Sequence, residues 1–475
     1  MSRSVGASAV SVPRVPDPGD AGFDQARATE CARWLAPGCA LAAVCLGVAL
    51  QQSNGFLHPT ALRLVALAYV LVIVAVVVPR PSRFARVDRS LVELMGLAGL
   101  ALHLGYLFTS VPGVYLRLAE GDFLSFQWGL VGVAVVGASL VRGAPRWVFG
   151  AQVALLVAMH FALGVWVIER SPDPVIDVYR FHRIAIDGLR SGIDPYGLTF
   201  PDLYPATNMY GPGLSVNGRL QFGFPYFPLS LLVAMPGQIV AGDPRYAQLV
   251  AIELAAVLMA FARRGGLGSI AAVLYLTTPR IFFVLEQSWT EPFLVLGVSA
   301  VVFAACRDSR WLPWAFGAFI GLKQYLVFAL PAVALLLGRR SDRHGLLTFL
   351  LKATMLATAV TLPFFVWNPR GFWRSVVTLQ FHQPFRPDAL SFLASWVSSG
   401  HEQPPVLVAF VVAGAASALA LWRLPRTPAG FGAAVGLTLF TFFVFNKQAF
   451  CNYYFFVVGT LCASVAAWHA PDPSP

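Results

Sequence analysis

The sequence predicts an all-α polytopic membrane protein whose chain crosses the bilayer about fourteen times, within a range of roughly 12–15. Hydrophobic residues make up 57% of the 475 residues and the mean hydropathy is +0.67, whereas a soluble domain is about 45–50% apolar. Apolar runs of roughly 17–25 residues recur along the chain, which is the length a helix needs to cross the hydrocarbon core. These runs are continuous, whereas the strands of an outer-membrane barrel alternate in polarity.

The net charge of +11 arises from short basic clusters between the apolar runs. This distribution is typical of membrane topology signals, and we expect no nucleic-acid partner. Residues 1–32 are polar and lack an apolar core, so they are predicted to form a disordered cytoplasmic tail rather than a cleaved signal peptide. Residues 469–475 are predicted to form a short C-terminal tail.

The expected spans follow the apolar runs in chain order. They are 34–51, 60–79, 91–110, 126–141, 146–168, 247–263, 268–285, 290–306, 311–323, 324–338, 345–367, 404–422, 427–445 and 449–467. The segment 227–242 is short and contains Pro236, so we expect it to lie in the interface or to re-enter. Residues 311–338 are expected to form a hairpin that turns near Lys323.

Arginine clusters between these spans place one set of loops, and both chain ends, in the cytoplasm. The arginines used are Arg80, Arg83, Arg86, Arg89, Arg142, Arg146, Arg263, Arg264, Arg307, Arg310, Arg339, Arg340, Arg343, Arg423 and Arg426. The long loops 169–226 and 368–403 then fall on the extracytoplasmic face. The same face collects most polar side chains that could carry chemistry, so we expect the active site there.

Residues 176–197 concentrate three Asp, three Arg and one His in a chain that is only 12% charged. Residues 175–190 are predicted to form an amphipathic interfacial helix. Asp187 and Arg190 fit a solvated charged face. Asp177 lies about nine residues beyond a predicted span, at headgroup depth, where a carboxylate can accept a proton from a hydroxyl.

Further candidates occupy the extracytoplasmic ends of predicted spans. Only three residues are lysines, and two of them, Lys323 and Lys447, lie at such ends, where they either reach to the interface or bind a phosphate. The stretch "EQSWTEP" places Glu286, Gln287 and Glu291 at a junction where a carboxylate is costly to bury. The "DPY" and "YFP" turns, with Asp194, Tyr196 and Tyr226, also fit ordinary turn chemistry.

Five segments together resemble the bacterial GT-C membrane glycosyltransferases, and especially the polyprenyl-phosphate-mannose-dependent mannosyltransferases that elongate phosphatidylinositol mannosides. The segments are "IDVYRFH", "GIDPYG", "FPYFPLSLLVAMPG", "LEQSWTEPFLVLG" and "GAFIGLKQYLVFALP". The resemblance runs from about residue 165 to 465 and implies a GT-C-like catalytic core over 146–468, preceded by transmembrane helices over 33–145. Unlike the family pattern, five predicted spans precede the Asp-bearing loop, and Glu-Gln-Ser-Trp replaces Gly-Gln-x-Asn.

The resemblance implies transfer of a sugar, with mannose as the family-level expectation, from a polyprenyl-phosphate donor to a hydroxyl of a glycolipid or cell-envelope glycan. Asp177 would be the base in an inverting displacement, and the cations for the departing phosphate would be Lys323 and Lys447, followed by Arg374, His382 and Arg386. The expected substrate-binding residues are Asp194, Tyr196, Tyr226, Glu286, Gln287, Glu291 and Asn452. No cofactor is expected, a divalent metal stays open, and the protein is expected in the cell membrane.

Three other functions stay open at this point. A transporter or flippase of lipid-linked sugars would place charges near the bilayer midplane and often contains internal repeats. A ligase or another lipid-headgroup transferase would share the predicted topology. A non-catalytic assembly subunit would not need Asp177.

Overall fold

The computed structural model of the protein describes residues 34–78, 88–143, 145–205, 209–263, 267–337 and 343–468. Within these ranges the chain is predominantly helical, and its strands are β1 (Ser215–Val216) and β2 (Arg219–Leu220), a short antiparallel hairpin. The all-α prediction is therefore confirmed. Outside these ranges lie both predicted tails and six of the arginines used for topology, Arg80, Arg83, Arg86, Arg264, Arg339 and Arg340.

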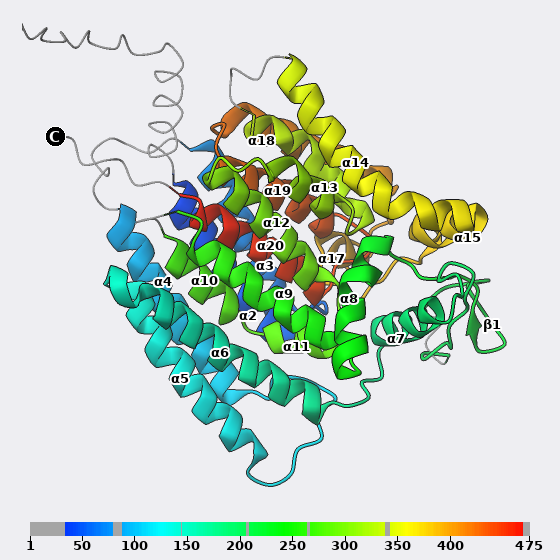
Figure 1. The fold of residues 1–475 in the computed structure, drawn as a ribbon, viewed down its shortest axis with the longest axis horizontal. Coiled ribbons are helices and arrows are strands. Elements are labelled where there is room, and N and C mark those ends of the chain that lie inside the picture. The colour runs from blue at the N-terminus through cyan, green and yellow to red at the C-terminus, as the bar shows by residue number, and fades with distance from the viewer. Residues whose placement is uncertain are drawn as a thin grey trace, which may run out of the picture.

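Five helices begin the part of the chain that the structure describes. They are α2 (Leu35–Ser53), α3 (Pro59–Val77), α4 (Asp88–Thr109), α5 (Asp122–Arg142) and α6 (Arg146–Arg170). Helix α2 packs against α3, α4 and the last helix, α20 (Cys451–Ala466), so it belongs to the central layer. Helices α4, α5 and α6 form a layer along one flank in Figure 1.

The remaining described helices build the rest of the bundle and the shorter segments beside it. They are α7 (Asp177–Arg190), α8 (Pro228–Ala241), α9 (Arg245–Ala260), α10 (Gly268–Leu276), α11 (Ile281–Glu286), α12 (Glu291–Cys306), α13 (Leu312–Ile320), the 3₁₀ helix η2 (Gln324–Leu335), α14 (Arg343–Trp367), α15 (Pro369–Trp373), the π-helical turn η3 (Arg374–Thr378), α16 (Leu379–His382), α17 (Phe392–Ser398), α18 (Leu407–Arg423) and α19 (Pro428–Val444). Figure 1 shows α7 and the β-hairpin together at one end.

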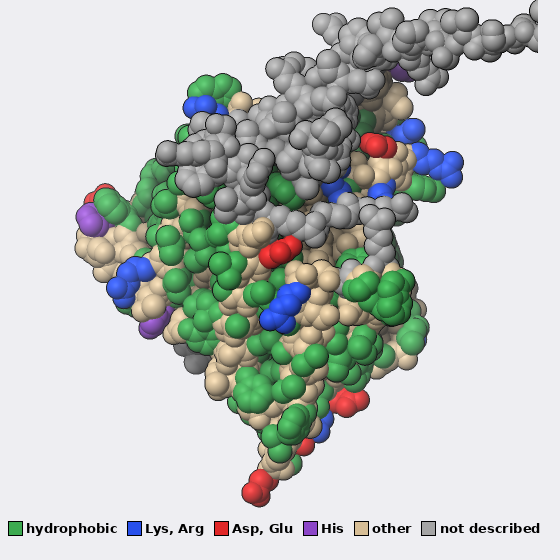
Figure 2. All heavy atoms as spheres, turned by 90° about the vertical axis from the view of Figure 1, so that its left-hand side faces the viewer, with side chains coloured by type: hydrophobic (Ala, Val, Ile, Leu, Met, Phe, Trp, Pro, Cys, Tyr) green, Lys and Arg blue, Asp and Glu red, His purple; other side chains and the backbone are tan. Residues whose placement is uncertain are grey.

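Six helices in the described ranges are long and apolar enough to cross a membrane. They are Leu35–Ser53, Pro59–Val77, Ser90–Thr109, Asp122–Arg142, Trp147–Arg170 and His344–Trp367. Six further apolar helices have 10–17 residues. The surface of the described residues in Figure 2 is largely hydrophobic. It has few charged side chains, and several of these lie at the lower end of the view. These features agree with a membrane protein, while the total of about fourteen spans stays a prediction.

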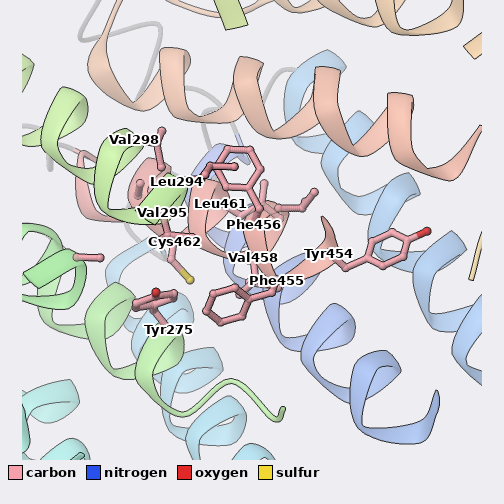
Figure 3. Close-up of a cluster of buried hydrophobic side chains, with 14 of the residues drawn as sticks. Tyr275, Leu294, Val295, Val298, Tyr454, Phe455, Phe456, Val458, Leu461 and Cys462 are labelled. Atoms are coloured by element: carbon pink, nitrogen blue, oxygen red, sulfur yellow. The ribbon is translucent and has the colours of Figure 1, made fainter. Parts of the chain in front are cut away.

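The buried core lies where α20 meets α2, α10, α12 and α19. Figure 3 shows part of it, where Phe455, Phe456 and Leu461 lie beside Leu294, Val295, Val298 and Tyr275. Helices α19 and α20 are hydrophobic on all sides and almost fully buried, as expected for central helices of a large membrane bundle.

Local sequence sets several helix ends. Proline occupies the first turn of α3, α8 and α19. Backbone N–H groups in a first turn have no acceptor within the helix, so the N–H that proline lacks costs the helix no hydrogen bond. Asn54 ends α2 and Gly242 ends α8, both in the left-handed conformation. These ends fix where the connecting turns leave the bundle.

The span predicted over 268–285 is wrong as a single helix, because the helix breaks after Leu276. Pro279 cannot donate a backbone hydrogen bond, and Arg280 has φ = 69°, which is incompatible with a continuous right-handed helix. The Thr277 and Thr278 hydroxyls donate to the carbonyls of Val273 and Leu274, so the broken turn keeps its polar groups paired. The segment predicted as a hairpin, 311–338, contains α13 and η2, with Lys323 between them.

Candidate functional site

A cavity of about 710 Å³ lies among α7, the loop before α8, η2, the segment 376–386 and the segment 446–453. Seven of the residues predicted from the sequence line it: Asp177, Tyr226, Gln287, Lys323, Arg386, Lys447 and Asn452. The first and last of them, Asp177 and Asn452, are 275 positions apart in the chain, and the fold brings them to one space. A cavity of this volume suits a ligand with several rings or a ring and part of a chain.

Asp177 is the first residue of α7 and is partly buried against the cavity. Its Oδ1 accepts the Val178 N–H at 2.8 Å, and its Oδ2 accepts the Tyr210 hydroxyl at 2.8 Å. Burial raises the pKa of this carboxyl, while the Tyr210 hydrogen bond and the charge of Arg386 oppose the rise. A carboxylate with a raised pKa, facing a cavity, has the properties of a general base.

The hydroxyl of Tyr204 accepts the backbone N–H of Asp177 at 3.3 Å and so steadies the start of α7. Both tyrosine rings line the cavity, at 6.2 Å from one another. Burial, followed by the charge of Asp177, raises the pKa of Tyr204 and of Tyr210 above the usual phenol range. Both phenols therefore stay protonated and can act only as neutral hydrogen-bonding partners.

Lys323 lies between α13 and η2 with its side chain 7% exposed. Its Nζ donates to Glu291 Oε1 at 2.5 Å and to Thr290 Oγ1 at 2.9 Å. Three rings surround the ammonium, those of Tyr226, Tyr325 and Tyr453, with centroids at 4.8, 5.3 and 5.9 Å. Lys323 thus reaches the cavity as one half of a buried, neutral ion pair.

Lys447 and Arg386 form a second cationic wall. Lys447 Nζ donates to the carbonyls of Phe381 and Gln383 at 3.1 and 2.5 Å. Because backbone carbonyls are neutral, these two hydrogen bonds leave the positive charge of Lys447 uncompensated. The backbone N–H of Arg386 donates to the Lys447 carbonyl at 3.0 Å, which holds the two residues side by side. The Arg386 guanidinium pairs with Asp388 and lies 4.7 Å above the Phe450 ring.

One arm of the cavity is apolar. It is lined by Phe227, Val327, Phe328, Val406, Phe410 and Phe442. Val327 is 52% exposed and Phe410 is 37% exposed, so this arm continues into the apolar outer surface of the bundle. An apolar passage from a charged chamber to that surface suits a ligand with a polar head and a hydrocarbon chain.

Arg374 and His382 do not line the cavity. The chain from 374 to 382, a π-helical turn followed by α16, directs Val376, Val377 and Gln380 to the cavity and leaves both basic side chains exposed. His382 Nδ1 bonds the Thr378 carbonyl of its own helix at 2.9 Å. Arg374 and His382 therefore do not share this cavity with Asp177, because they lie on the other face of this segment, and their role toward the donor phosphate stays a prediction.

Asp194 and Tyr196 also lie outside the cavity lining. Asp194 accepts the Tyr196 N–H at 3.0 Å and the Asn368 side-chain amide at 2.8 Å, and the Tyr196 hydroxyl donates to the Tyr226 carbonyl at 2.9 Å. The "DPY" turn thus ties the start of α15 to the "YFP" segment. The two residues help to hold Tyr226 in place, and their direct contact with substrate stays a prediction.

Glu286 and Glu291 do not line the cavity either. Glu286 is fully buried and accepts the backbone N–H groups of Val114 and Tyr115 at 2.7 and 2.8 Å. Glu291 pairs with Lys323. Glu286 and Glu291 thus bind protein groups outside the cavity lining, and substrate contact by either stays a prediction.

Sequence reasoning missed the tyrosines beside Asp177 and a buried pair in the helical bundle. His160 Nδ1 of α6 lies 2.6 Å from Glu253 Oε1 of α9, and both side chains are almost completely buried. The signal for this pair was one His and one Glu, each inside a long apolar run. The loop tyrosines gave no such signal, because the sequence between them does not fix their distance from Asp177.

Among the described residues, no group of three His, Cys, Asp or Glu side chains is arranged to hold a metal ion. Comparison of the chain with protein-family models, with curated proteins and with solved structures gives no match.

Proposed function

We propose that the protein is a membrane glycosyltransferase of the GT-C type, which moves a sugar from a polyprenyl-phosphate donor to a hydroxyl of a glycolipid or envelope glycan. The single observation that carries the proposal is that Asp177, Arg386 and Lys447 share one cavity that has an apolar arm. The resemblance of "IDVYRFH", "GIDPYG" and "FPYFPLS" to that superfamily supports it. We propose mannose as the sugar and the extracytoplasmic face of the cell membrane as the place of reaction.

Asp177 is proposed as the base. Its carboxylate takes the proton of the acceptor hydroxyl while the hydroxyl oxygen attacks the anomeric carbon and the bond to the donor phosphate breaks. Phosphate leaves without a proton donor at neutral pH, so one carboxylate suffices, whereas glycoside hydrolysis uses two. The displacement inverts the anomeric centre because the acceptor attacks opposite the leaving group.

The positive charge for the departing phosphate is assigned first to Lys447 and then to Arg386, whose partner Asp388 is 43% exposed to solvent, unlike the buried Glu291 that pairs with Lys323. Lys447 is held by carbonyl groups and keeps its charge available, whereas Lys323 is neutralised by Glu291 at 2.5 Å. Preorganised donors at a developing charge contribute roughly 3–4 kcal/mol each, by analogy with oxyanion holes. We propose that Lys323 supports the cavity through its aromatic contacts and acts on the phosphate less directly.

The apolar arm supports a lipid-linked donor. A polyprenyl chain bound along Phe328, Phe410 and Phe442 would leave the cavity toward the bilayer, since nearby Val327 is half exposed. Each buried CH₂ group contributes about 0.8 kcal/mol, so a few isoprene units are enough for selective binding. A soluble nucleotide-sugar donor would make no use of such an arm.

The proposal is tested with purified protein in nanodiscs, radiolabelled polyprenyl-phosphate mannose and a membrane glycolipid extract. Wild-type protein is expected to label a glycolipid, and Asp177→Asn is expected to lose at least about 10²-fold in rate. Asp187→Asn, on the exposed side of the same helix, is the matched control and should transfer normally. Transfer at the wild-type rate by Asp177→Asn would remove the central assignment.

A second function, a transporter or flippase of lipid-linked sugars, is favoured by the buried His160–Glu253 pair. Ionisable pairs inside a bundle are typical of proton-coupled transport. A fluorescent polyprenyl-phosphate analogue in proteoliposomes distinguishes the two functions. Transbilayer movement without a glycolipid product would favour the transporter.

A further inference from the structure

The turn between α4 and α5, residues 110–121, forms one wall of the cavity, although it belongs to the helices that precede the GT-C-like core. Val114 and Tyr115 of this turn line the cavity. Fully buried Glu286, in the core, accepts both of their backbone N–H groups at 2.7 and 2.8 Å. This wall is therefore fixed to the core by a charge-assisted pair of hydrogen bonds.

Two further contacts hold the turn. The Arg280 guanidinium donates to the Val111 carbonyl at 3.0 Å. A side chain at Gly113 would place its Cβ 2.3 Å from Glu286 Oε1, so only glycine allows this close approach. The turn is thus a preformed part of the cavity, with its ring-bearing residue, Tyr115, in a set position.

Tyr115 lies on the same side of the cavity as the proposed base. Its hydroxyl donates to the Val175 carbonyl at 2.8 Å, two residues before Asp177. Burial, then the charges of Glu286 and Asp177, raises the pKa of its phenol, as expected within electrostatic reach of both carboxylates. Because the hydroxyl is tethered, the ring is what Tyr115 offers to a ligand.

The other N-terminal turn lies on the cationic side. The Phe56 ring lies in the turn after α2, and its centroid is 5.8 Å from that of Phe450. The Arg386 guanidinium lies 4.7 Å from the same Phe450 ring. The two turns therefore border the cavity beside different groups, Phe56 near Phe450 and Arg386, and Tyr115 near the start of α7 with Asp177. If phosphate occupies the Arg386–Lys447 half, the hydroxyl that meets Asp177 approaches past Tyr115.

We propose that the α4–α5 turn is the acceptor-recognition wall and that Tyr115 stacks against a sugar ring of a saccharide-bearing acceptor. The inference rests on the proposed transferase function. An aromatic ring beside a carboxylate suits a sugar, whose C–H face packs on the ring while its hydroxyls bond the carboxylate. Glu286 acts as a positioning residue, since it reaches the ligand only through the turn.

The test is steady-state transfer kinetics of the protein in nanodiscs. The donor is polyprenyl-phosphate mannose and the acceptor is a purified mono-mannosylated glycolipid, and each is varied in turn to give its KM. Tyr115→Ala is expected to raise the acceptor KM about tenfold, equivalent to 1.4 kcal/mol, with the donor KM within about twofold. Tyr115→Phe keeps the ring and should keep the acceptor KM. Tyr106→Ala, on α4 outside the cavity lining, is the matched control and should behave as wild type.

Glu286→Gln and Glu286→Ala examine the wall itself. Glutamine keeps one oxygen to accept the two N–H groups, so Glu286→Gln should raise the acceptor KM less than Glu286→Ala does. Glu120 is exposed on the same turn, and Glu120→Ala should leave the acceptor KM unchanged. An unchanged acceptor KM in Tyr115→Ala, with wild-type transfer intact, overturns this inference alone. Absence of transfer by wild-type protein overturns the proposed function instead.

Discussion

The Tyr210 hydroxyl donates a 2.8 Å hydrogen bond to Oδ2 of Asp177, 33 residues earlier in the chain. The loop residue thus holds one oxygen of the carboxylate, and the backbone N–H of Val178 holds the other. This arrangement fixes the carboxylate plane at the cavity and opposes the effect of burial on its pKa.

Removing this hydrogen bond should change the pH dependence of transfer. Asp177 must be ionised to act as a base, so the rate falls as the pH drops through its raised pKa. Tyr210→Phe removes a donor that stabilises the ionised form, so the pKa rises further and the acid limb moves to higher pH. The measurement is the rate between pH 4 and pH 9. An acid limb that stays in place, or moves to lower pH, contradicts the role of Tyr210.

The phosphate assignment predicts a large effect at Lys447. Lys447→Met should lower the transfer rate by about 10²–10³, the size expected for one lost donor at a developing charge. Burial lowers the pKa of Lys447, so phosphate binding should weaken as the pH rises through that value. Lys352→Met, on α14 outside the cavity lining, should retain the wild-type rate. Equal rates for the two variants would remove Lys447 from the site.

The Lys323–Glu291 pair predicts non-additive stability. Both side chains are at least 93% buried, so Glu291→Leu alone leaves an unpaired ammonium and should destabilise the fold by about 3–5 kcal/mol. The double variant Lys323→Met/Glu291→Leu leaves no buried charge and should recover most of that loss. Unfolding in detergent measures the cycle, and additive losses would show that the pair is not coupled.

Asp194 is expected to affect folding more than chemistry. Asp194→Ala removes the acceptor of the Asn368 amide and of the Tyr196 N–H, which should cost about 1–3 kcal/mol in the free energy of unfolding. Transfer per folded molecule should stay within about twofold of wild type. A stable but inactive Asp194→Ala would indicate direct contact with substrate.

The proposed orientation is open to labelling from the two sides of the membrane. In a Cys31→Ser/Cys306→Ser background, the remaining cysteines are buried. Cysteines introduced at Asp187 and Glu402, both exposed, should react with an impermeant maleimide from the extracytoplasmic side, and those at Arg142 and Arg426 only from the cytoplasm. Reaction of the 187 position from the cytoplasm would reverse the proposed face of the cavity.

The helical class followed from hydropathy alone, because long apolar runs leave helices as the main way to pair backbone groups in lipid. The helix over 177–190 was also predictable, since Val178, Phe181 and Ala185 share one face and are all buried. Hydropathy could not show that the span over 268–285 breaks, because the break depends on the backbone at Pro279 and Arg280.

The charged residues of the site were predictable, whereas the groups that they bind within the protein were not. Asp177, Lys323 and Lys447 stood out because charge is rare in this chain, and all three line one cavity. Glu286 and Glu291, five residues apart, looked equivalent, yet one holds a turn of the N-terminal helices and the other neutralises Lys323. The segment that packs beside each carboxylate decides this difference. The distance between the two residues in the sequence does not reveal that segment.

The α2–α3 turn has a consequence for biogenesis. The Leu57 N–H donates to the Asp388 carbonyl, and the Leu390 N–H donates to the carbonyls of Gly55 and Ala449. A nascent chain therefore inserts its first helices long before their partners leave the ribosome, and the chamber closes only when α20 arrives. A chain truncated before Cys451 would carry Asp177 yet lack Asn452 and Tyr453 of the cavity lining.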